Sequence, residues 1–238
     1  MPFTRGHFLK HRPWLYHFTT PDNVDLLRRG MAMHSAAELV KRANRYRVQV
    51  ATPDEFLGQP RLDRMTLQIG PDLRVTLNDQ RPLRHEAGFH DLRGTHADFV
   101  RCLNGYVFFW PGTADGPKPK GDLAKTFQAR YAAFGCVRVP AAEAWTEGTP
   151  IQFCRYNSGA PQARDGVTRG SHIFVTCEEK SLRVRLVAEV VFLGSIPLPL
   201  STQWRPPGAV EWQALFPGGR ADESIRPDGI AGFGEEAH

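Results

Sequence analysis

One segment near the C-terminal end constrains the fold more than any other. From Leu182 to Phe192 every second residue is apolar, and this spacing predicts a strand over residues 182–193 with one face in the core. The chain also contains 22 glycines and 19 prolines, so 41 of its 238 residues favour turns. Such a chain folds into many short elements, which argues against a bundle of long helices.

The opposite face of this predicted strand carries a single acidic residue, Glu189, between Val187 and Val191. A carboxylate between apolar neighbours is partly desolvated, so its pKa is expected to rise unless a cation or hydrogen-bond donor offsets the burial. Glu189 is therefore a candidate catalytic residue. The alternative is that it lies on an edge strand and pairs in solvent with Arg183 or Arg185.

The remaining segments predict helices early in the chain and strands later, which gives an α+β fold. Helices are expected after the N-cap residues Thr20, Ser35, Thr52 and Asp122, and over residues 95–103. Strands are expected at residues 14–18, 74–78, 106–110, 136–139, 151–156 and 172–176. We expect a single domain over residues 1–204, followed by a Pro/Gly-rich tail, 205–238, that is partly docked through Trp212.

Composition and charge favour a soluble protein with a polyanionic partner. The formal net charge is +5, the calculated pI is near 9.2 and the mean hydropathy is −0.38. The sequence has no run of about 18 apolar residues and no signal-peptide pattern, so a cytoplasmic protein is expected. The four cysteines are far apart, which favours buried free thiols over a zinc site or a disulfide framework.

Several side chains are candidates for binding a nucleotide. His17 lies in an aromatic run just before a predicted helix start, where a neutral imidazole can hydrogen-bond ribose or phosphate oxygens. A buried histidine bonded to the backbone is the alternative. Tyr106 and Phe108 share one face of their strand and can stack on a planar ring or fill the core. Arg81 and Arg84 can hold a pyrophosphate, although loop arginines are commonly solvated.

A polar loop between two predicted strands is a candidate for contacting a nucleic-acid backbone. It contains Asn157, Arg164 and Arg169, but a flexible surface loop has the same composition. The motifs of P-loop, Rossmann, zincin and α/β-hydrolase proteins are absent from the sequence. His7 and His11 have the i, i+4 spacing of a metal pair, yet they lie in a terminal segment, and no metal is expected.

Four separated segments together resemble DarT-type ADP-ribosyltransferases, which move ADP-ribose from NAD onto DNA bases. The opening Y-H-[IF]-T…N…G-[LM] signature is similar to Tyr16-His17-Phe18-Thr19, Asn23 and Gly30-Met31. The others are the strand and arginine loop at 77–84, the aromatic strand at 105–110, and Ala188-Glu189-Val190-Val191 with Pro197. Residues 104–110 and 157–159 also resemble a group of uncharacterised bacterial proteins related to this fold.

This resemblance implies an ADP-ribosyltransferase-like fold, with two small mixed or antiparallel sheets around an NAD cleft and helices on the N-terminal side. It implies that His17 and Thr19, with Tyr16, Arg84, Tyr106 and Phe108, bind NAD. Glu189 would hold the nicotinamide ribose and activate the acceptor, and Arg81 would be the catalytic arginine. The family usually has adjacent arginines, whereas Pro82-Leu83 separates Arg81 from Arg84, so which arginine acts is open.

The leading hypothesis is therefore transfer of ADP-ribose from NAD to a nucleic-acid base, with DNA favoured over RNA. A toxin, balanced by an antitoxin that removes ADP-ribose, is the setting that the resemblance implies. One alternative is an NAD glycohydrolase or a transferase with a protein or small-molecule acceptor. Another is a non-catalytic nucleic-acid-binding protein that uses Arg164, Arg169, Lys118 and Lys120.

Overall fold

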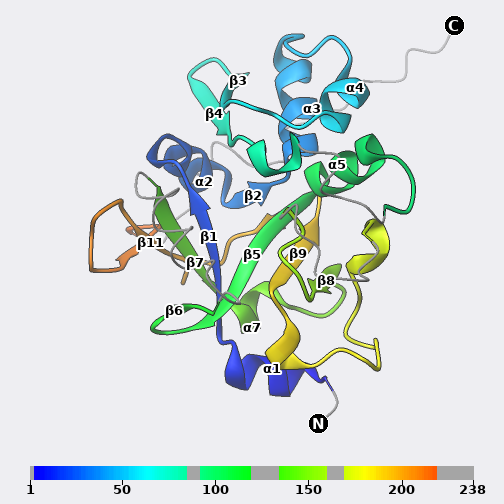
Figure 1. Ribbon diagram of the computed structural model, residues 1–238. Coiled ribbons are helices and arrows are strands. Elements are labelled where there is room, and N and C mark those ends of the chain that lie inside the picture. Colours follow the sequence, from blue (N-terminus) through cyan, green and yellow to red (C-terminus); the bar gives the residue numbers. More distant parts are fainter. Residues whose placement is uncertain (1–2, 85–91, 119–133, 160–168, 219–238) are drawn as a thin grey trace, which may run out of the picture.

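The structure is a computed structural model that describes residues 3–84, 92–118, 134–159 and 169–218, with only the backbone of Pro82 and Arg84. The fold is mixed α+β, as predicted, and an antiparallel sheet dominates it (Figure 1). The helices and 3₁₀ turns are α1 Arg5–His11, η1 Pro21–Asn23, α2 Val24–Gly30, α3 Ala36–Tyr46, α4 Pro53–Gly58, η2 Arg81–Arg84, α5 His96–Asn104, α7 Ala141–Ala144, η4 Ser171–Ile173 and η5 Val184–Leu186. The strands are β1 Trp14–Thr19, β2 Ala32–His34, β3 Met65–Gly70, β4 Leu73–Leu77, β5 Tyr106–Thr113, β6 Gly116–Pro117, β7 Gly135–Pro140, β8 Ile151–Cys154, β9 Glu189–Leu193, β10 Ser195–Pro197, β11 Gln203–Arg205 and β12 Gln213–Ala214.

The main sheet has the strand order β12-β11-β7-β1-β5-β9-β8, with β6 paired to β5. Strand β5 changes partners along its length: residues 106–109 pair with β9, and residues 110–112 pair with β1. Two further pairs, β10–β2 and β3–β4, lie outside this sheet. The structure thus has one large sheet, whose two parts are joined by β5, where the resemblance implies two small sheets.

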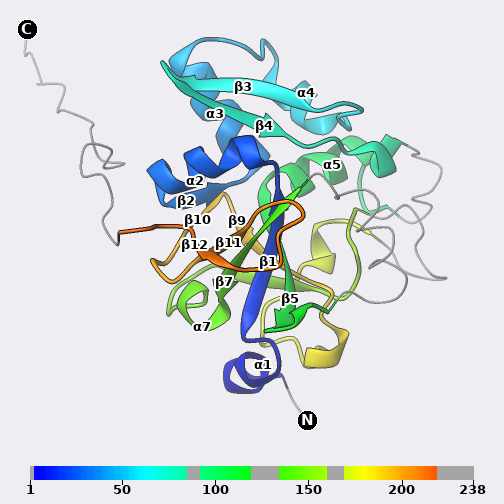
Figure 2. The same cartoon turned by 90° about the vertical axis from the view of Figure 1, so that its left-hand side faces the viewer.

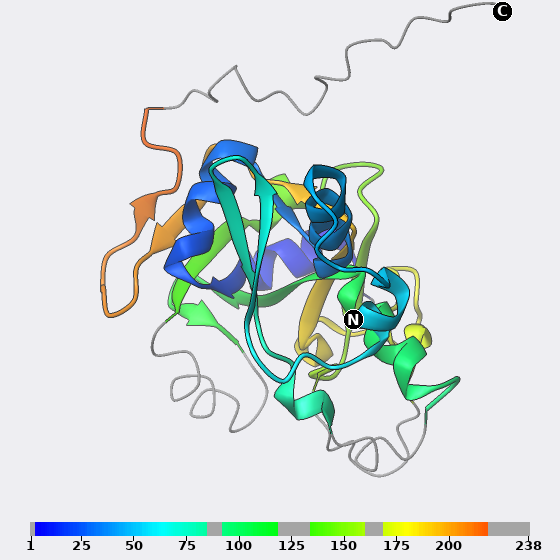
Figure 3. The same ribbon diagram turned by 90° about the horizontal axis from the view of Figure 1, so that it is seen from above.

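Helices α3 and α4 and the β3–β4 hairpin form a layer at one end of the sheet, and α1 lies at the opposite end (Figure 2). Seen from above, the cyan β3–β4 hairpin passes over the strands of the main sheet (Figure 3). Much of the N-terminal half of the chain therefore covers one end of the sheet. No helix among the described residues is long and apolar enough to cross a membrane.

The strand predicted over residues 182–193 is shorter in the structure. Only Glu189–Leu193 forms β9, and Val184–Leu186 forms a 3₁₀ turn before it. The neighbouring strand β8 has only four residues, and they pair with residues 189–192. Five of the six alternating apolar residues are buried as predicted, whereas Leu186 is only half-buried. Without a longer partner strand they cannot form an extended ladder.

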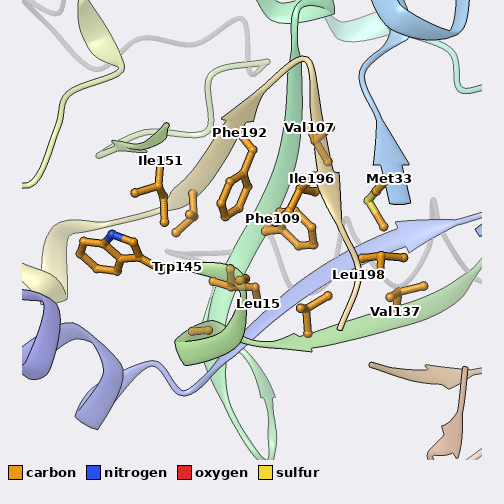
Figure 4. Packing of buried hydrophobic residues seen from close by; sticks show 14 of the residues in the cluster. Leu15, Met33, Val107, Phe109, Val137, Trp145, Ile151, Phe192, Ile196 and Leu198 are labelled. Atoms are coloured by element: carbon orange, nitrogen blue, oxygen red, sulfur yellow. The ribbon is translucent and has the colours of Figure 1, made fainter. Parts of the chain in front are cut away.

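The described residues form three apolar clusters, and the largest lies against the main sheet (Figure 4). It contains Leu15 of β1, Phe109 of β5 and Phe192 of β9, together with Trp145 and Ile196. A second cluster joins α3 to the β3–β4 hairpin, and a third packs α5 against residues 173–174 and Val191. Both faces of β9 are consequently covered, since Phe192 and Val191 belong to different clusters.

Most of the helix starts predicted from capping residues are confirmed. The Ser35 side chain accepts from the Glu38 N–H, and Thr95 forms a capping box with Asp98. Thr52 precedes α4 without a side-chain cap. Helix α2 ends at Gly30, and the left-handed residue that follows it is Met31, at φ 43°. The helix predicted after Asp122 lies outside the described residues.

The predicted tail continues the fold beyond residue 204. Strand β11 spans this boundary and pairs with β7, and β12 pairs with β11. Leu215 is fully buried in the largest cluster. The Arg138 guanidinium lies between the rings of Trp14 and Trp212, at 4.4 and 4.1 Å from their centroids. Trp212 therefore contacts the sheet through Arg138 of β7.

Candidate functional site at the fork between strands β1 and β5

Strands β1 and β5 diverge after three residue pairs, and this fork forms the candidate site. The register runs from Trp14↔Gly112 to Tyr16↔Trp110, after which β1 continues to pair with β7 while β5 pairs with β9. In the fork the His17 Nδ1 donates to the backbone oxygen of Phe108 at 2.9 Å. An imidazole therefore takes the bond that a backbone N–H of a neighbouring strand would make.

A cavity of about 210 Å³ occupies this fork and extends under α2, β2 and β4. It brings together four of the residues that the sequence predicted to bind NAD, from two strands far apart in the chain: His17, Thr19, Tyr106 and Phe108. Polar residues other than the predicted NAD contacts also line it: Asn23, His34, Arg61, Asn78, Gln80 and Asn104.

His17 is half-buried, and burial lowers its pKa, although the bond to Phe108 acts in the opposite direction. The imidazole is therefore neutral at physiological pH. Only a protonated nitrogen can bond to a carbonyl oxygen, so Nδ1 carries the proton and Nε2 is left as an acceptor. The structure thus provides a neutral hydrogen-bond acceptor at the fork.

Asn23 fixes one wall of the cavity. Its Nδ2 donates to Thr19 Oγ1 at 3.0 Å and to the Thr76 carbonyl at 2.9 Å, and its Oδ1 accepts from the Thr76 N–H at 2.8 Å. The Asn23 side chain is buried with these bonds made. It therefore ties the end of β1 to β4 and holds Thr19 in place.

Arg61 provides the positive charge in the cavity. Its Nη1 donates to Asn104 Oδ1 at 2.9 Å, and its Nε donates to the backbone oxygen of Asn78 at 3.2 Å. Burial lowers its pKa to about 10, against the opposing effect of Asp79, so the guanidinium is charged at neutral pH. No local pattern marks Arg61 in the sequence, because these partners are 43 and 17 residues away.

Two polar atoms at the cavity are buried without a hydrogen-bond partner among the described residues. They are Nδ1 of His34 and Oδ1 of Asn78. Burial, followed by the charge of Arg42, lowers the pKa of His34 to about 4, so its ring is neutral. Buried donors and acceptors are usually satisfied, so these two atoms are candidates for contacting a ligand.

Glu189 is the first residue of β9 and is only 3% exposed. Its Oε2 accepts from the Ser158 N–H at 3.1 Å, and Arg169 Nη1 donates to the Ser158 carbonyl at 2.9 Å. Burial raises the pKa of Glu189 to about 7, although the bonds from Ser158 and the charge of Arg169 lower it. The edge-strand alternative is therefore wrong, since β9 pairs with β5 on one side and β8 on the other.

Glu189 does not appear among the described residues that line the cavity. Phe108 lies opposite Val191, and side chains two residues apart on a strand share a face. Glu189 is therefore on the same face of the sheet as Phe108. Strand β5 lies between β1 and β9. It carries the cavity residues Tyr106 and Phe108 and is the direct neighbour of the strand that carries Glu189.

Two other predicted NAD contacts lie away from the cavity lining. Arg81 is exposed, where it donates to the Leu62 carbonyl at 2.7 Å and pairs with Asp63 at 2.9 Å. Tyr16 is fully buried, its hydroxyl donates to the Thr113 carbonyl, and its ring packs on Trp212. The side chain of Arg84 lies outside the described part of the chain.

The loop predicted to contact nucleic acid has a different role at Arg169. This arginine is only 3% exposed, bonds to Ser158 and forms a parallel bridge with Leu92, so the prediction of a surface contact is wrong. Asn157 is half-buried and Lys118 is exposed. Arg164 and Lys120 lie outside the described residues.

Comparison with known proteins identifies a family. The model of a family of unknown function, DUF7002, matches residues 13–200. The chain belongs to the DUF7002 family. No curated protein and no solved structure matches it. The DUF7002 match runs from the start of β1 to beyond β10, so it includes the fork, the cavity and Glu189.

Proposed function

We propose that this DUF7002 protein is an NAD-dependent ADP-ribosyltransferase with an ADP-ribosyltransferase-like fold, acting on a nucleic-acid base and on DNA in preference to RNA. The observation that carries the proposal is the fork between β1 and β5. It gathers His17, Thr19, Tyr106 and Phe108 around one cavity. The first two residues and the last two were predicted from separate sequence motifs. If the resemblance were due to chance, these two pairs would not be expected to line the same cavity.

The cavity has the chemical groups that part of NAD requires. Tyr106 and Phe108 offer aromatic faces for nicotinamide, and His17 Nε2 is an acceptor for a ribose hydroxyl. Arg61 would neutralise the pyrophosphate in the role that the sequence gave to Arg81. A volume of about 210 Å³ suits one ring and its sugar, so the rest of the dinucleotide would extend from the cavity.

Glu189 would be the catalytic carboxylate. In the proposed step the bond from ribose C1′ to the nicotinamide nitrogen breaks, and its electron pair leaves with nicotinamide. A nitrogen of the acceptor base bonds to C1′, and the proton that this nitrogen loses goes to Glu189. A carboxylate also stabilises the positive charge that develops on the sugar. A pKa of about 7 suits a group that accepts a proton near neutral pH.

This role requires that the Glu189 carboxylate, which accepts from the Ser158 N–H, faces the acceptor when both substrates are bound. The test uses purified protein, labelled NAD and four potential acceptors: single-stranded DNA, duplex DNA, RNA and protein. Mass analysis of each fraction is expected to find one ADP-ribose on a DNA base, with nicotinamide released.

The matched variants are Glu189→Gln and Glu55→Gln, which make the same chemical change at a buried and at an exposed position. We expect Glu189→Gln to reduce transfer by about 100-fold or more, as for loss of a general base, and Glu55→Gln to leave it unchanged. Full transfer by a folded Glu189→Gln protein would exclude the proposed role of Glu189.

Other outcomes separate the alternatives. Nicotinamide release without an adduct would indicate an NAD glycohydrolase, and an adduct on protein would change the acceptor class. Binding of nucleic acid without any nicotinamide release would indicate a non-catalytic binding protein.

A further inference from the structure

A second hollow lies at the opposite end of β1 from the NAD cavity, between α1 and η5. We call it the basic groove, and its volume is about 500 Å³. In Figure 1, α1 lies at the end of the sheet opposite α3 and α4, beside the segment that leads into β9. The groove is lined by His7, His11, Arg12, Arg183, Val184 and Arg185.

The ionisable residues that line this groove are all basic. Three of the six lining residues are arginines, two are histidines, and none is acidic. Other arginines of the described chain, such as Arg28 and Arg101, pair with a carboxylate within 4.0 Å. No such ion pair involves the three groove arginines among the described residues. The groove therefore concentrates positive charge that nearby protein carboxylates do not neutralise.

Two of the guanidinium groups are partly buried and held in place. Arg183 Nη1 donates to the carbonyls of Lys180 and Leu182, at 2.6 and 2.7 Å. Arg12 Nη1 donates to the His11 carbonyl at 2.9 Å, and burial lowers the pKa of Arg12. Side chains fixed in this way lose less entropy when they bind an anion than freely rotating surface arginines do.

We propose that the basic groove binds phosphate groups. A guanidinium matches two phosphate oxygens with parallel N–H donors, and several arginines around one hollow suit an anion with multiple charges. The phosphate can belong to a small phosphorylated compound or to the backbone of a nucleic acid. The proposal does not depend on the transferase activity, because the groove and the NAD cavity share no lining residue.

The test compares Arg185→Gln and the double variant Arg12→Gln/Arg185→Gln with the wild-type protein. Arg185 is exposed, and its side chain has no hydrogen bond or ion pair with another described residue, so its substitution should not disturb folding. The controls are Arg45→Gln and Arg45→Gln/Arg47→Gln, which remove the same charge from exposed positions on and after α3. Thermal unfolding checks that each variant is folded.

Two probes distinguish the sources of phosphate. Binding of tripolyphosphate is measured by calorimetry, and binding of a short fluorescent oligothymidylate by anisotropy over a range of salt concentrations. We expect each groove substitution to weaken binding about tenfold while the controls retain wild-type affinity. For single-stranded nucleic acid, the logarithm of the binding constant falls linearly with the logarithm of the salt concentration. Each lost phosphate contact should make this negative slope less steep by about 0.7.

A loss of oligonucleotide affinity, with or without a loss for tripolyphosphate, would place a nucleic-acid backbone in the groove. A loss for tripolyphosphate alone would indicate a small phosphorylated ligand. If the wild-type protein binds neither probe, or if groove and control variants bind equally well, the proposal is overturned.

Discussion

At the scale of single residues, Glu189 couples the stability of the protein to pH. Its pKa is about 7 in the folded state and about 4.5 as an ordinary glutamate. Between these values the folded protein binds a proton that the unfolded chain releases, so stability falls as the pH rises. Below about pH 4.5 the carboxyl group is neutral in both states, and above about pH 7 the buried charge is fully present.

Glu189→Gln should remove this pH dependence, because glutamine is neutral and its Oε1 can still accept from Ser158. The two pKa values differ by about 2.5 units, so the variant should be more stable than wild type by about 3 kcal/mol at pH 8. Near pH 4.5 the two proteins should have similar stability. Urea unfolding at both pH values measures the difference.

Glu55→Gln is the control for this measurement, since Glu55 is exposed and its substitution should leave the pH dependence as in wild type. Parallel stability curves for wild type and Glu189→Gln would contradict the raised pKa.

Some residues of the candidate site could be predicted from the sequence, and others could not. His17 and Phe108 were found because strand periodicity and motif spacing are local properties. Arg61 was missed because Asn78 and Asn104, which hold it, come from distant segments. Arg169 was misassigned for a similar reason: its Gly- and Arg-rich surroundings are typical of an exposed loop, whereas its contacts with Ser158 and Leu92 bury it.

At the scale of elements, strand length was the least predictable property. A pattern of alternating apolar residues indicates which side chains are buried. Side chains can be buried without their backbone forming a strand. Residues 184–186 are an example, because Val184 is buried within a 3₁₀ turn. Helix starts were better predicted, since caps such as Ser35 depend on residues three positions away.

The edge of the main sheet depends on a glycine. Gly135 of β7 lies under the indole of Trp204 on β11, and a Cβ at this position would overlap the ring. Gly135→Ala should therefore displace Trp204 and destabilise the protein by about 1–3 kcal/mol, as overpacking of a core does. Tryptophan fluorescence and thermal unfolding report the two effects.

Gly6→Ala provides the opposite case. Gly6 lies within α1, and nothing is within 4 Å of a Cβ placed there. Alanine should stabilise the helix by about 0.5–1 kcal/mol. Unchanged stability of Gly135→Ala would show that β11 does not pack on β7 as described.

At the scale of the whole molecule, the segment from Trp204 to Leu215 is part of the main core. Trp204 is 4% exposed and Leu215 is 0% exposed, and both belong to the cluster that contains Leu15 and Phe109. The Leu215 N–H also donates to the Thr202 carbonyl at 2.9 Å. High proline and glycine content suggested an extended tail, but composition does not reveal that Leu215 packs into a core cluster formed by distant strands.

Leu215→Ala should therefore destabilise the whole fold and not only the tail. Removal of a fully buried leucine side chain costs about 2–5 kcal/mol, because the transfer free energy is lost and a cavity remains. Val210→Ala, at a position that is 81% exposed, should change stability by less than about 0.5 kcal/mol. If Leu215 anchors the tail to the main core, tryptophan fluorescence and far-UV circular dichroism should report one transition, shifted to a lower temperature in Leu215→Ala. An unshifted main transition, preceded by a separate early change in fluorescence, would instead mean that residues after 204 unfold independently of the sheet.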